Sequence, residues 1–307
     1  DMKTLDHNHL QNEVVESDDD FGFMSHGSQA PMTASMDLEF GNGVSLMMGA
    51  FSTEFVRPIS GAHTREATFG EDPASEAVQR GRRLFFDAKS PAVSHGGTFA
   101  CATCHLEGSD DGLVWLTTGP MQTIQLNGRL KDTGPFNWLG TKSSLLDNMD
   151  QTVERMGGDG LSEAQLSDLR TFLIEGLRAP VNPHRDPAGL TEIQKDGESI
   201  FNRVDVGCAS CHSGENFADG ESYDVGTSTQ EERFLRESLI SDGEDLPPPG
   251  VFNTPSLRGV WRSAPYMHNG IAKDLREAIE LTSGTMGDIS MLEEYEIVAL
   301  VEYLKTL

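Results

Sequence analysis

Apolar residues recur at helical spacing in the chain, and the stretches that carry them form two matching pairs. The segments LSDLRTFL at 166–173 and IVALVEYL at 297–304 have apolar residues at positions i, i+3, i+6 and i+7, a pattern typical of an amphipathic helix. Earlier in each half stand RGRRLFFD at 80–87 and DGESIFNR at 196–203, each with a glycine four residues ahead of a phenylalanine. The pattern predicts two copies of one helical unit.

The two copies match residue by residue. Gly81 and Phe85 correspond to Gly197 and Phe201, and the apolar positions that correspond in the later helices are Leu166, Leu169, Phe172 and Leu173 against Ile297, Leu300, Tyr303 and Leu304. GLSEAQL at 160–166 supplies a serine N-cap for the first of these helices. RAPVNPHRDPAG at 178–189 holds three prolines and is typical of a linker. Strand signals are sparse, so we expect an all-α fold with tandem domains at 71–180 and 181–307.

Two regions lie outside this repeat. Residues 1–70 show no sustained periodicity, and we expect them to form an irregular N-terminal extension. His7 and His9 in this extension could bind a metal, but a solvated tail is the favoured interpretation. Residues 213–250, which end in PPPG, form a long acidic insertion, and loops of this length often carry a function.

The charge balance narrows the classes of partner. The chain has 307 residues, 23 Lys and Arg against 49 Asp and Glu, and a formal net charge of −26. Nucleic acid and anionic membrane surfaces both require a positive footprint, so neither is expected as a partner. An acidic face can instead attract a basic protein. No run of 18 apolar residues exists, so no transmembrane segment is predicted. Asp1 at the start fits an exported chain after removal of its signal, or a trimmed one.

All four cysteines lie in two pentapeptides, CATCH at 101–105 and CASCH at 208–212. A Cys-x-x-Cys pair alone could be a redox dithiol or a disulfide, and two such pairs could form one zinc site. The histidine directly after each second cysteine favours a different chemistry. In Cys-x-x-Cys-His, the thiols form thioethers with the haem vinyl groups and the histidine binds the iron. The spacing therefore predicts two covalent c-type haems, held by Cys101, Cys104, His105, Cys208, Cys211 and His212.

Three further segments give the chain a specific resemblance. NTPSLRGVWRSAPYMHNG at 253–270, the DLREAIEL that follows it, and FNWLGT at 136–141 are similar to the bacterial dihaem cytochrome c peroxidases, a family that includes the MauG-type enzymes. The similarity covers about residues 75–307. It implies two tandem cytochrome c domains, with peroxide reacting at the N-terminal haem.

The resemblance also assigns roles to single residues. His105 would be the proximal ligand of the peroxidatic haem, and His212 that of the electron-transferring haem. Trp138 would relay electrons between the two haems, the alternative being a large core aromatic. Glu154 would carry the proton during peroxide cleavage, with Arg155 stabilising negative charge beside it; the alternative for Glu154 is an exposed helix glutamate.

The distal ligands are where the sequence departs from parts of the family. Many of these peroxidases have a distal histidine shortly after the first motif, but no histidine occurs here between His105 and His184. The first iron is therefore expected to be open, with His95 a less favoured ligand. At the second haem, the family spacing selects Thr282, a poor iron ligand.

Met286, one turn beyond Thr282, is our choice as iron ligand of the second haem, and Met291 is the second choice. The alternative is that Met286 only packs. The family also binds calcium between its domains. Those positions fall on Gln122, Ser263 and Pro265, although glutamine replaces the usual asparagine.

These features together predict a peroxidase that reduces H₂O₂ with electrons from a small cytochrome c or cupredoxin. One alternative is a MauG-type oxidase that uses peroxide to modify a side chain of a partner protein, and another is a dihaem electron carrier without catalysis. Haem attachment takes place outside the cytoplasm, so a periplasmic or otherwise exported location is expected. A cytoplasmic zinc protein is the remaining alternative.

Overall fold

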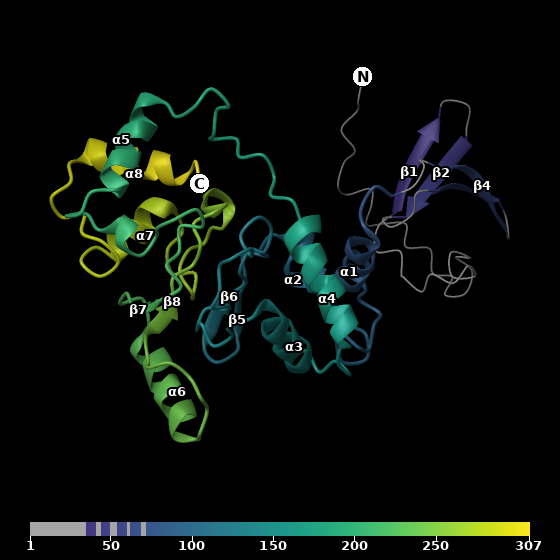
Figure 1. Cartoon of the computed structure of the whole chain (residues 1–307), viewed down its shortest axis with the longest axis horizontal. Coiled ribbons are helices and arrows are strands. Elements are labelled where there is room, and N and C mark those ends of the chain that lie inside the picture. The colour runs from purple at the N-terminus through teal and green to yellow at the C-terminus, as the bar shows by residue number, and fades with distance from the viewer. Residues whose placement is uncertain (1–34, 41–43, 50–53, 60–61, 69–71) are drawn as a thin grey trace. The chain divides into compact units, whose positions relative to one another are not determined.

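The computed structural model describes residues 35–40, 44–49, 54–59, 62–68 and 72–307 of the chain (Figure 1). Contacts divide the chain into two units, Asp1–Pro73 and Ala74–Leu307. The tail expected around His7 and His9 lies outside the described residues.

The first unit contains a four-stranded antiparallel sheet in the order β1-β2-β3-β4. Its strands are β1 (Ser35–Phe40), β2 (Val44–Gly49), β3 (Glu54–Ile59) and β4 (Ala62–Thr68). The prediction of an irregular extension is therefore wrong for these residues. Short connections let neighbouring strands pair their backbone groups without a strong hydrophobic pattern. The alternation of Met36, Leu38 and Phe40 in β1 is the signal that could have revealed the sheet.

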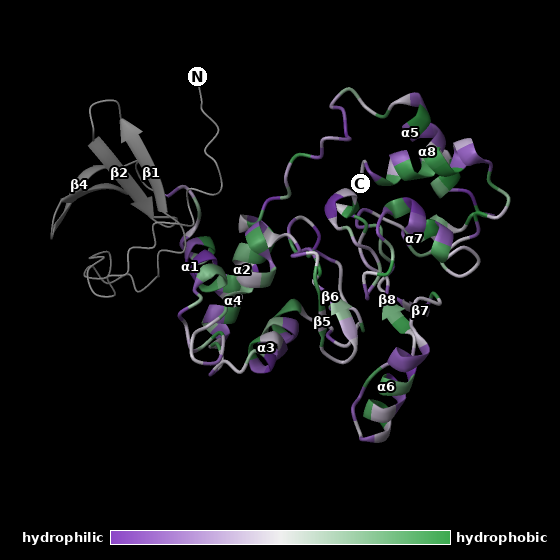
Figure 2. Ribbon diagram, turned by 180° about the vertical axis from the view of Figure 1, so that it is seen from behind, coloured by the Kyte–Doolittle hydropathy of each residue, from purple (hydrophilic) through white to green (hydrophobic). Residues whose placement is uncertain are grey.

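The second unit begins with α1 (Glu76–Phe86), whose N-cap Ser75 accepts a hydrogen bond from the amide of Val78. Later in the same half, α4 (Glu163–Thr171) has Ser162 as its N-cap, as the sequence predicts. Ser162 and Gln165 form a capping box at this end of the helix. The helix continues as a wider π-helical segment, η3 (Phe172–Gly176). Figure 2 shows both hydrophobic and hydrophilic residues on α1 and α4, as expected of amphipathic helices.

The helices α1 and α4 cross at a glycine. A Cβ atom at Gly81 would lie 2.0 Å from the carbonyl oxygen of Asp168, so only a residue without a side chain allows this approach. One turn further along α1, the ring of Phe85 lies 5.3 Å from that of Phe172, measured between centroids. The two helices that the sequence predicts in the first half therefore pack against each other.

The same crossing recurs in the other half, between α5 (Glu192–Phe201) and α8 (Glu294–Leu304). A Cβ atom at Gly197 would lie 2.0 Å from the carbonyl oxygen of Ala299, and the rings of Phe201 and Tyr303 are 5.4 Å apart. The helical repeat predicted from the sequence is thus reproduced in three dimensions.

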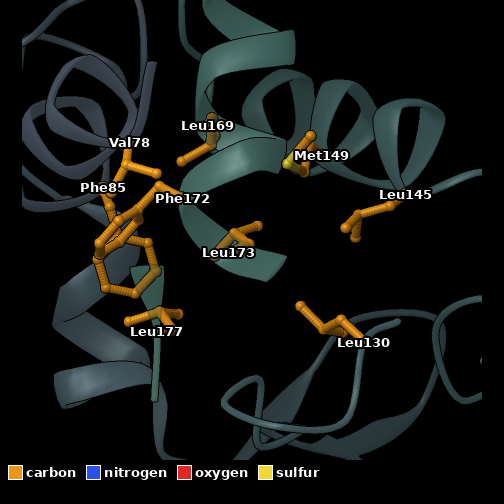
Figure 3. Packing of buried hydrophobic residues seen from close by; sticks show 9 residues of the cluster. All are labelled: Val78, Phe85, Leu130, Leu145, Met149, Leu169, Phe172, Leu173 and Leu177. Carbon is orange, nitrogen blue, oxygen red and sulfur yellow. The ribbon is translucent and has the colours of Figure 1, made fainter. Parts of the chain in front are cut away.

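Each half has its own hydrophobic core. Figure 3 shows the cluster of the first half, to which α1, α3, α4 and η3 contribute. Its buried members are Val78, Phe85, Leu130, Leu145, Met149, Leu169, Phe172, Leu173 and Leu177. The corresponding cluster of the second half is Ile200, Phe201, Val206, Val260, Leu275, Ala299, Leu300, Tyr303 and Leu304.

Each half also contains a turn that begins at a cis peptide bond, and this turn is the second repeated structure. After the cis bonds Gly134–Pro135 and Ala264–Pro265, the chain forms matching turns with the isolated bridges Phe136 to Lys142 and Tyr266 to Ala272. Each turn leads into a capped helix, α3 (Leu145–Arg155) after the first and α7 (Leu275–Leu281) after the second. Trp138 lies four residues after Gly134, and His268 lies four residues after Ala264, so the two residues occupy equivalent positions in the repeat.

The fold of the second unit is mostly helical, but it is not free of strands. Two short antiparallel pairs occur, β5 (Val114–Leu116) with β6 (Pro120–Gln122) and β7 (Ser222–Asp224) with β8 (Val251–Asn253). The all-α prediction is therefore confirmed only in part, because three-residue strands are too short to leave an alternating pattern. Between β7 and β8 lies α6 (Gln230–Ser241), the one regular helix of the acidic insertion in the described chain.

The crossing of α5 and α8 generates a stability prediction. Gly197→Ala should lower the free energy of unfolding by at least ~2 kcal/mol, because the new methyl group must push apart two helix backbones. The measurement is urea unfolding of the haem-loaded protein followed by far-ultraviolet circular dichroism.

Ser199→Ala is the matched control, since Ser199 is exposed on the same helix and its replacement should change the free energy by less than about 0.5 kcal/mol. Equal stability of the Gly197→Ala variant and the control would contradict the close crossing.

Candidate functional site

The first Cys-x-x-Cys-His motif forms a single tight turn. Cys101–Cys104 make up the short helix α2, and the amide of His105 donates to the carbonyl of Cys101 over 3.0 Å. The two thiols therefore lie one turn apart with the imidazole directly after them. This is the arrangement that thioether attachment and axial iron binding require.

The second motif has the same local structure. Cys208–Ser210 form η4, which starts after Gly207 in the left-handed region, and the amide of His212 donates to the carbonyl of Cys208 over 3.1 Å. All four cysteines are free thiols, so neither pair forms a disulfide in this structure.

Both motif histidines are suited to bind iron, His212 being buried and His105 partly buried. The Nδ1–H of His212 donates to the carbonyl of Phe217 over 3.0 Å, which leaves Nε2 unprotonated and able to bind a metal. Burial lowers the pKa of His212 and of His105, favouring the neutral ring that a ligand needs. Nδ1 of His105 is buried without a hydrogen-bond partner in the described part of the chain.

A cavity of about 320 Å³ opens beside the second motif. Cys208, Cys211 and His212 form part of its wall. Apolar side chains complete much of the rest: Phe201, Phe252, Leu257, Val260, Leu275, Ile279, Leu300 and Leu304. An apolar cavity with two thiols and a neutral imidazole on its wall suits a covalently held haem.

The first motif lies against an equivalent set of residues. Cys101 and Ala102 pack on the cluster drawn in Figure 3. In the repeat, Leu130, Leu145 and Leu173 of this cluster correspond to Val260, Leu275 and Leu304, three residues that line the second cavity. The residues around both motifs therefore fit the same cofactor.

Thr282, at the position that the family spacing selects, and Met286, the chosen ligand of the second iron, both line the cavity. Thr282 is buried, and its hydroxyl donates to the carbonyl of Ala278 over 2.8 Å. Met286 lies in the turn after α7 and also lines the cavity. Met291, the reserve candidate, is 83% exposed and is not part of the cavity wall.

Trp138 lines the same cavity although it belongs to the first half. Its Nε1–H donates to the carbonyl of Gln122 over 2.7 Å, which fixes the indole. Its repeat partner His268 approaches it edge-on, with 6.5 Å between ring centroids. The two equivalent turns thus meet at this pair of rings.

His268 is surrounded by partners that the sequence reasoning did not identify. Its ring stacks on Phe252 at 3.8 Å, and its Nε2 lies 3.2 Å from a carboxylate oxygen of Glu232 on α6. Glu232 also accepts from the side-chain amide of Asn269 over 3.1 Å. The acidic insertion therefore contributes a carboxylate to the interior, which its composition alone could not indicate. The equivalence of Trp138 and His268 in the repeat was the available signal for this site.

The three proposed calcium ligands lie together. The side-chain Nε2 of Gln122 donates to the carbonyls of Ser263 and Pro265, over 3.3 and 2.5 Å. Calcium would require the amide oxygen to point at this position instead. Among the described residues, no group of three or more His, Cys, Asp or Glu side chains could hold a metal ion.

The predicted proton carrier lies apart from the residues above. Glu154 and Arg155 are exposed in the last turn of α3, where Arg155 makes a 3.5 Å hydrogen bond to the hydroxyl of Thr152. His95 is exposed as well, and its amide donates to the carbonyl of Met156 at the end of the same helix. The structure therefore brings Trp138 and Met286 to one cavity but leaves Glu154 at a helix end.

The structure bears on membrane association in one respect. Within the ranges that the structure describes, no helix is both long and apolar enough to cross a bilayer.

Comparisons with known proteins place the chain among dihaem proteins. No family model matches it. It is 30% identical to hydrazine synthase subunit gamma of Kuenenia stuttgartiensis, over 76% of this chain and 78% of that protein. It is 32% identical to the methylamine utilization protein MauG of Paracoccus denitrificans, over 72% and 77% respectively. With the cytochrome c551 peroxidase of Nitrosomonas europaea it shares 25% identity, over 76% and 80%.

Solved structures agree with these relatives. Hydrazine synthase of Kuenenia stuttgartiensis superposes with a TM-score of 0.63 and 28% identity, covering 77% of this chain and 89% of that one. A MauG-like protein associated with microbial copper homeostasis gives a TM-score of 0.59 at 22% identity, covering 79% and 91%, which supports the fold. With its two Cys-x-x-Cys-His motifs and these relatives, the chain belongs to the family of MauG and the dihaem cytochrome c peroxidases.

Proposed function

We propose that the protein is a dihaem c-type peroxidase that reduces H₂O₂ to water at the haem of the first motif. Electrons would enter through the haem of the second motif. The haem-binding halves would be the domains 71–180 and 181–307, and their separate hydrophobic cores support this division. Bound haem supplies the redox chemistry, while the chain holds the iron through His105 and His212.

The observation that carries this proposal is the structure of the segment after the first motif. Residues 106–122 form the short helix η2 (Leu106–Gly108) and the β5–β6 hairpin, and they contain no histidine. The indole of Trp115 in β5 is held by Asp111 and Thr123, each 3.1 Å from its Nε1. A segment with no imidazole cannot cap the first iron in the way a ligand-gated peroxidase does, and this supports an open peroxide site.

Trp138 is proposed as the relay between the two haem sites. It belongs to the first half by sequence and lines the cavity of the second, so its indole is shared by both. A fixed indole bonded through Nε1–H can lose and regain an electron without moving. The electron donor would be a small basic cytochrome c or a cupredoxin, for which the net charge of −26 is favourable.

Glu154 is proposed to move the proton during the reaction. Its carboxylate would take the proton from one peroxide oxygen and return it to the other as that oxygen leaves as water. Arg155, directly after it, would stabilise negative charge. Both side chains are exposed at the end of α3, so Glu154 could exchange its proton with solvent between turnovers.

A second candidate is a MauG-type oxidase that uses peroxide to modify a side chain of a partner protein. The identity of 32% with a MauG protein favours this candidate. The two activities differ in what supplies the electrons. Intact-mass analysis of co-purified proteins before and after peroxide separates them: a mass change in a partner supports the oxidase, and turnover with a reduced small cytochrome or cupredoxin supports the peroxidase.

Two further assignments complete the proposal. Calcium would bind at Gln122, Ser263 and Pro265 once the glutamine amide turns its oxygen toward the carbonyls. The protein would work in the periplasm or otherwise outside the cytoplasm, where c-type haem is attached.

The open first site predicts direct reaction with peroxide. The fully oxidised protein should react with H₂O₂ without prior reduction, and its resting spectrum should combine one high-spin and one low-spin ferric signal. Electron paramagnetic resonance and stopped-flow absorption measure both properties. Two low-spin haems that stay inert until reduced would contradict the proposal, and a protein inert in every redox state would be an electron carrier.

The role of Glu154 predicts a kinetic effect without a spectral one. Glu154→Gln should slow the peroxide step by about 10²-fold or more, because it removes the proton carrier and no ligand. The resting spectrum should stay unchanged. Glu163→Gln, an exposed glutamate in the first turn of α4, is the control and should react at the rate of the unmodified protein. Equal rates for both variants would assign the proton transfer elsewhere.

The two repeat-related methionines allow a test of the second iron ligand. Met286→Ala should convert the low-spin signal to high-spin and lower the reduction potential of that haem, because a thioether favours ferrous iron. Met156→Ala, at the equivalent position after α3, should leave the low-spin signal intact. Spectra are recorded with both haems attached. An unchanged low-spin signal in Met286→Ala would mean that this side chain only packs.

A further inference from the structure

Arg129 is a buried cation on the wall of the second cavity. It lies between Gly128 and Leu130 of the first half, and its side chain is 9% exposed. The cavity that it lines belongs to the second motif, with Cys208, Cys211 and His212 on the same wall. A charged group of one half is therefore directed into the cofactor cavity of the other.

Among the described residues, no carboxylate forms an ion pair with the guanidinium of Arg129, although the charge of Asp110 acts to raise its pKa. Its Nη2–H donates to the carbonyl of Ser256, and no ion pair involves this residue in the described part of the chain. Burial lowers the pKa of Arg129 to about 10. Burial destabilises the charged guanidinium, so an anion beside Arg129 in the cavity would stabilise it.

A second arginine, Arg262, adds to the positive charge near Arg129. Arg262, from the other half, donates to Ser109 over 3.0 Å and to the side chain of Asn127, and its buried Nε has no partner among the described residues. Asp110 is the nearby carboxylate, yet it forms no ion pair with either arginine and one of its oxygens is buried without a hydrogen bond. Two arginines against one carboxylate leave an excess of positive charge that an anion would balance.

We propose that Arg129 binds a propionate carboxylate of the haem attached to Cys208 and Cys211. The proposal rests on haem binding at the second motif, as in the function above, but not on peroxidase activity. A haem carries two carboxylates at the edge away from its thioether bonds, and a guanidinium binds a carboxylate through two parallel hydrogen bonds. The cavity joins the thiols to Arg129, so one porphyrin can reach both.

This contact would join the two halves through the cofactor. The thioethers and the iron bond of the second haem come from Cys208, Cys211 and His212, while the carboxylate would be held by a residue more than 70 positions earlier in the chain. A cation beside a haem stabilises the added electron, so Arg129 is expected to raise the reduction potential of this haem. Arg129 is thus a positioning residue for the electron-entry site.

The experiment compares Arg129→Met and Arg129→Lys with the unmodified protein, all with both haems attached. Spectroelectrochemical titration gives the two midpoint potentials, and resonance Raman spectra report hydrogen bonding of the propionates. Arg129→Met should lower the potential of the second haem, leave that of the first unchanged and shift a propionate bending band. Arg129→Lys keeps the charge but loses the paired hydrogen bonds, so the band should shift with a smaller change in potential.

Two controls exclude other causes. Arg276→Met removes an exposed arginine paired with Glu294 and should change neither potential nor Raman band. Asp110→Asn tests whether Asp110, rather than the haem, is the counter-ion of Arg129. The proposal is overturned if Arg129→Met and Arg129→Lys both keep the Raman bands and potentials of the unmodified protein, or if Asp110→Asn reproduces the changes of Arg129→Met.

The outcomes also separate this proposal from the proposed function. A pyridine haemochrome assay that finds no haem defeats both. Two haems with the expected shifts but no reaction with peroxide would retain the role of Arg129 and reject the peroxidase. Peroxide turnover with unaltered Raman bands in the arginine variants would do the reverse.

Discussion

The close approach of two helix backbones at a glycine is the contact on which each half of the second unit depends. At Gly81 and Gly197 the opposing carbonyl oxygen occupies the space of a side chain. This approach sets the distance at which the aromatic pairs, Phe85 with Phe172 and Phe201 with Tyr303, meet inside the core. Cys101 and Cys208, the first cysteine of each motif, pack on these cores, so the position of each motif follows from a helix crossing about one turn from its aromatic pair.

The helical part of this arrangement was predictable because its signals are local. Ser162 caps its helix within four residues, and the apolar stripes need only the sequence of one helix. The short strands were not predictable, because a three-residue pair depends on its partner rather than on its own pattern. The same holds for the second cavity. The hydrogen bond from Arg129 to Ser256 spans 127 positions, and the contact between Glu232 and His268 spans 36. Neither Arg129 nor Glu232 stands out from its neighbours in the sequence.

The two halves share their helix arrangement but differ at the ends of α3 and α7. Thr152 and Thr282 are equivalent, and both donate their hydroxyl to the carbonyl four residues earlier. Helix α3 continues past its threonine to Arg155, whereas α7 ends at Leu281 and the chain turns away. Met156 therefore caps a helix while Met286 sits in a turn on the cavity wall. A difference of one helical turn therefore places equivalent methionines in different surroundings, at a helix end in one half and on a cavity wall in the other.

Gln122 joins the halves through both its backbone and its side chain. The backbone carbonyl of Gln122 accepts a hydrogen bond from the indole Nε1–H of Trp138, and its backbone amide donates to the carbonyl of His268 over 2.6 Å. Its side-chain amide donates to the carbonyls of Ser263 and Pro265. Substitution can alter the side-chain bonds, but every residue except proline keeps both backbone bonds. A substitution at position 122 can therefore remove the side-chain hydrogen bonds between the halves while the backbone bonds keep the rings of Trp138 and His268 in register.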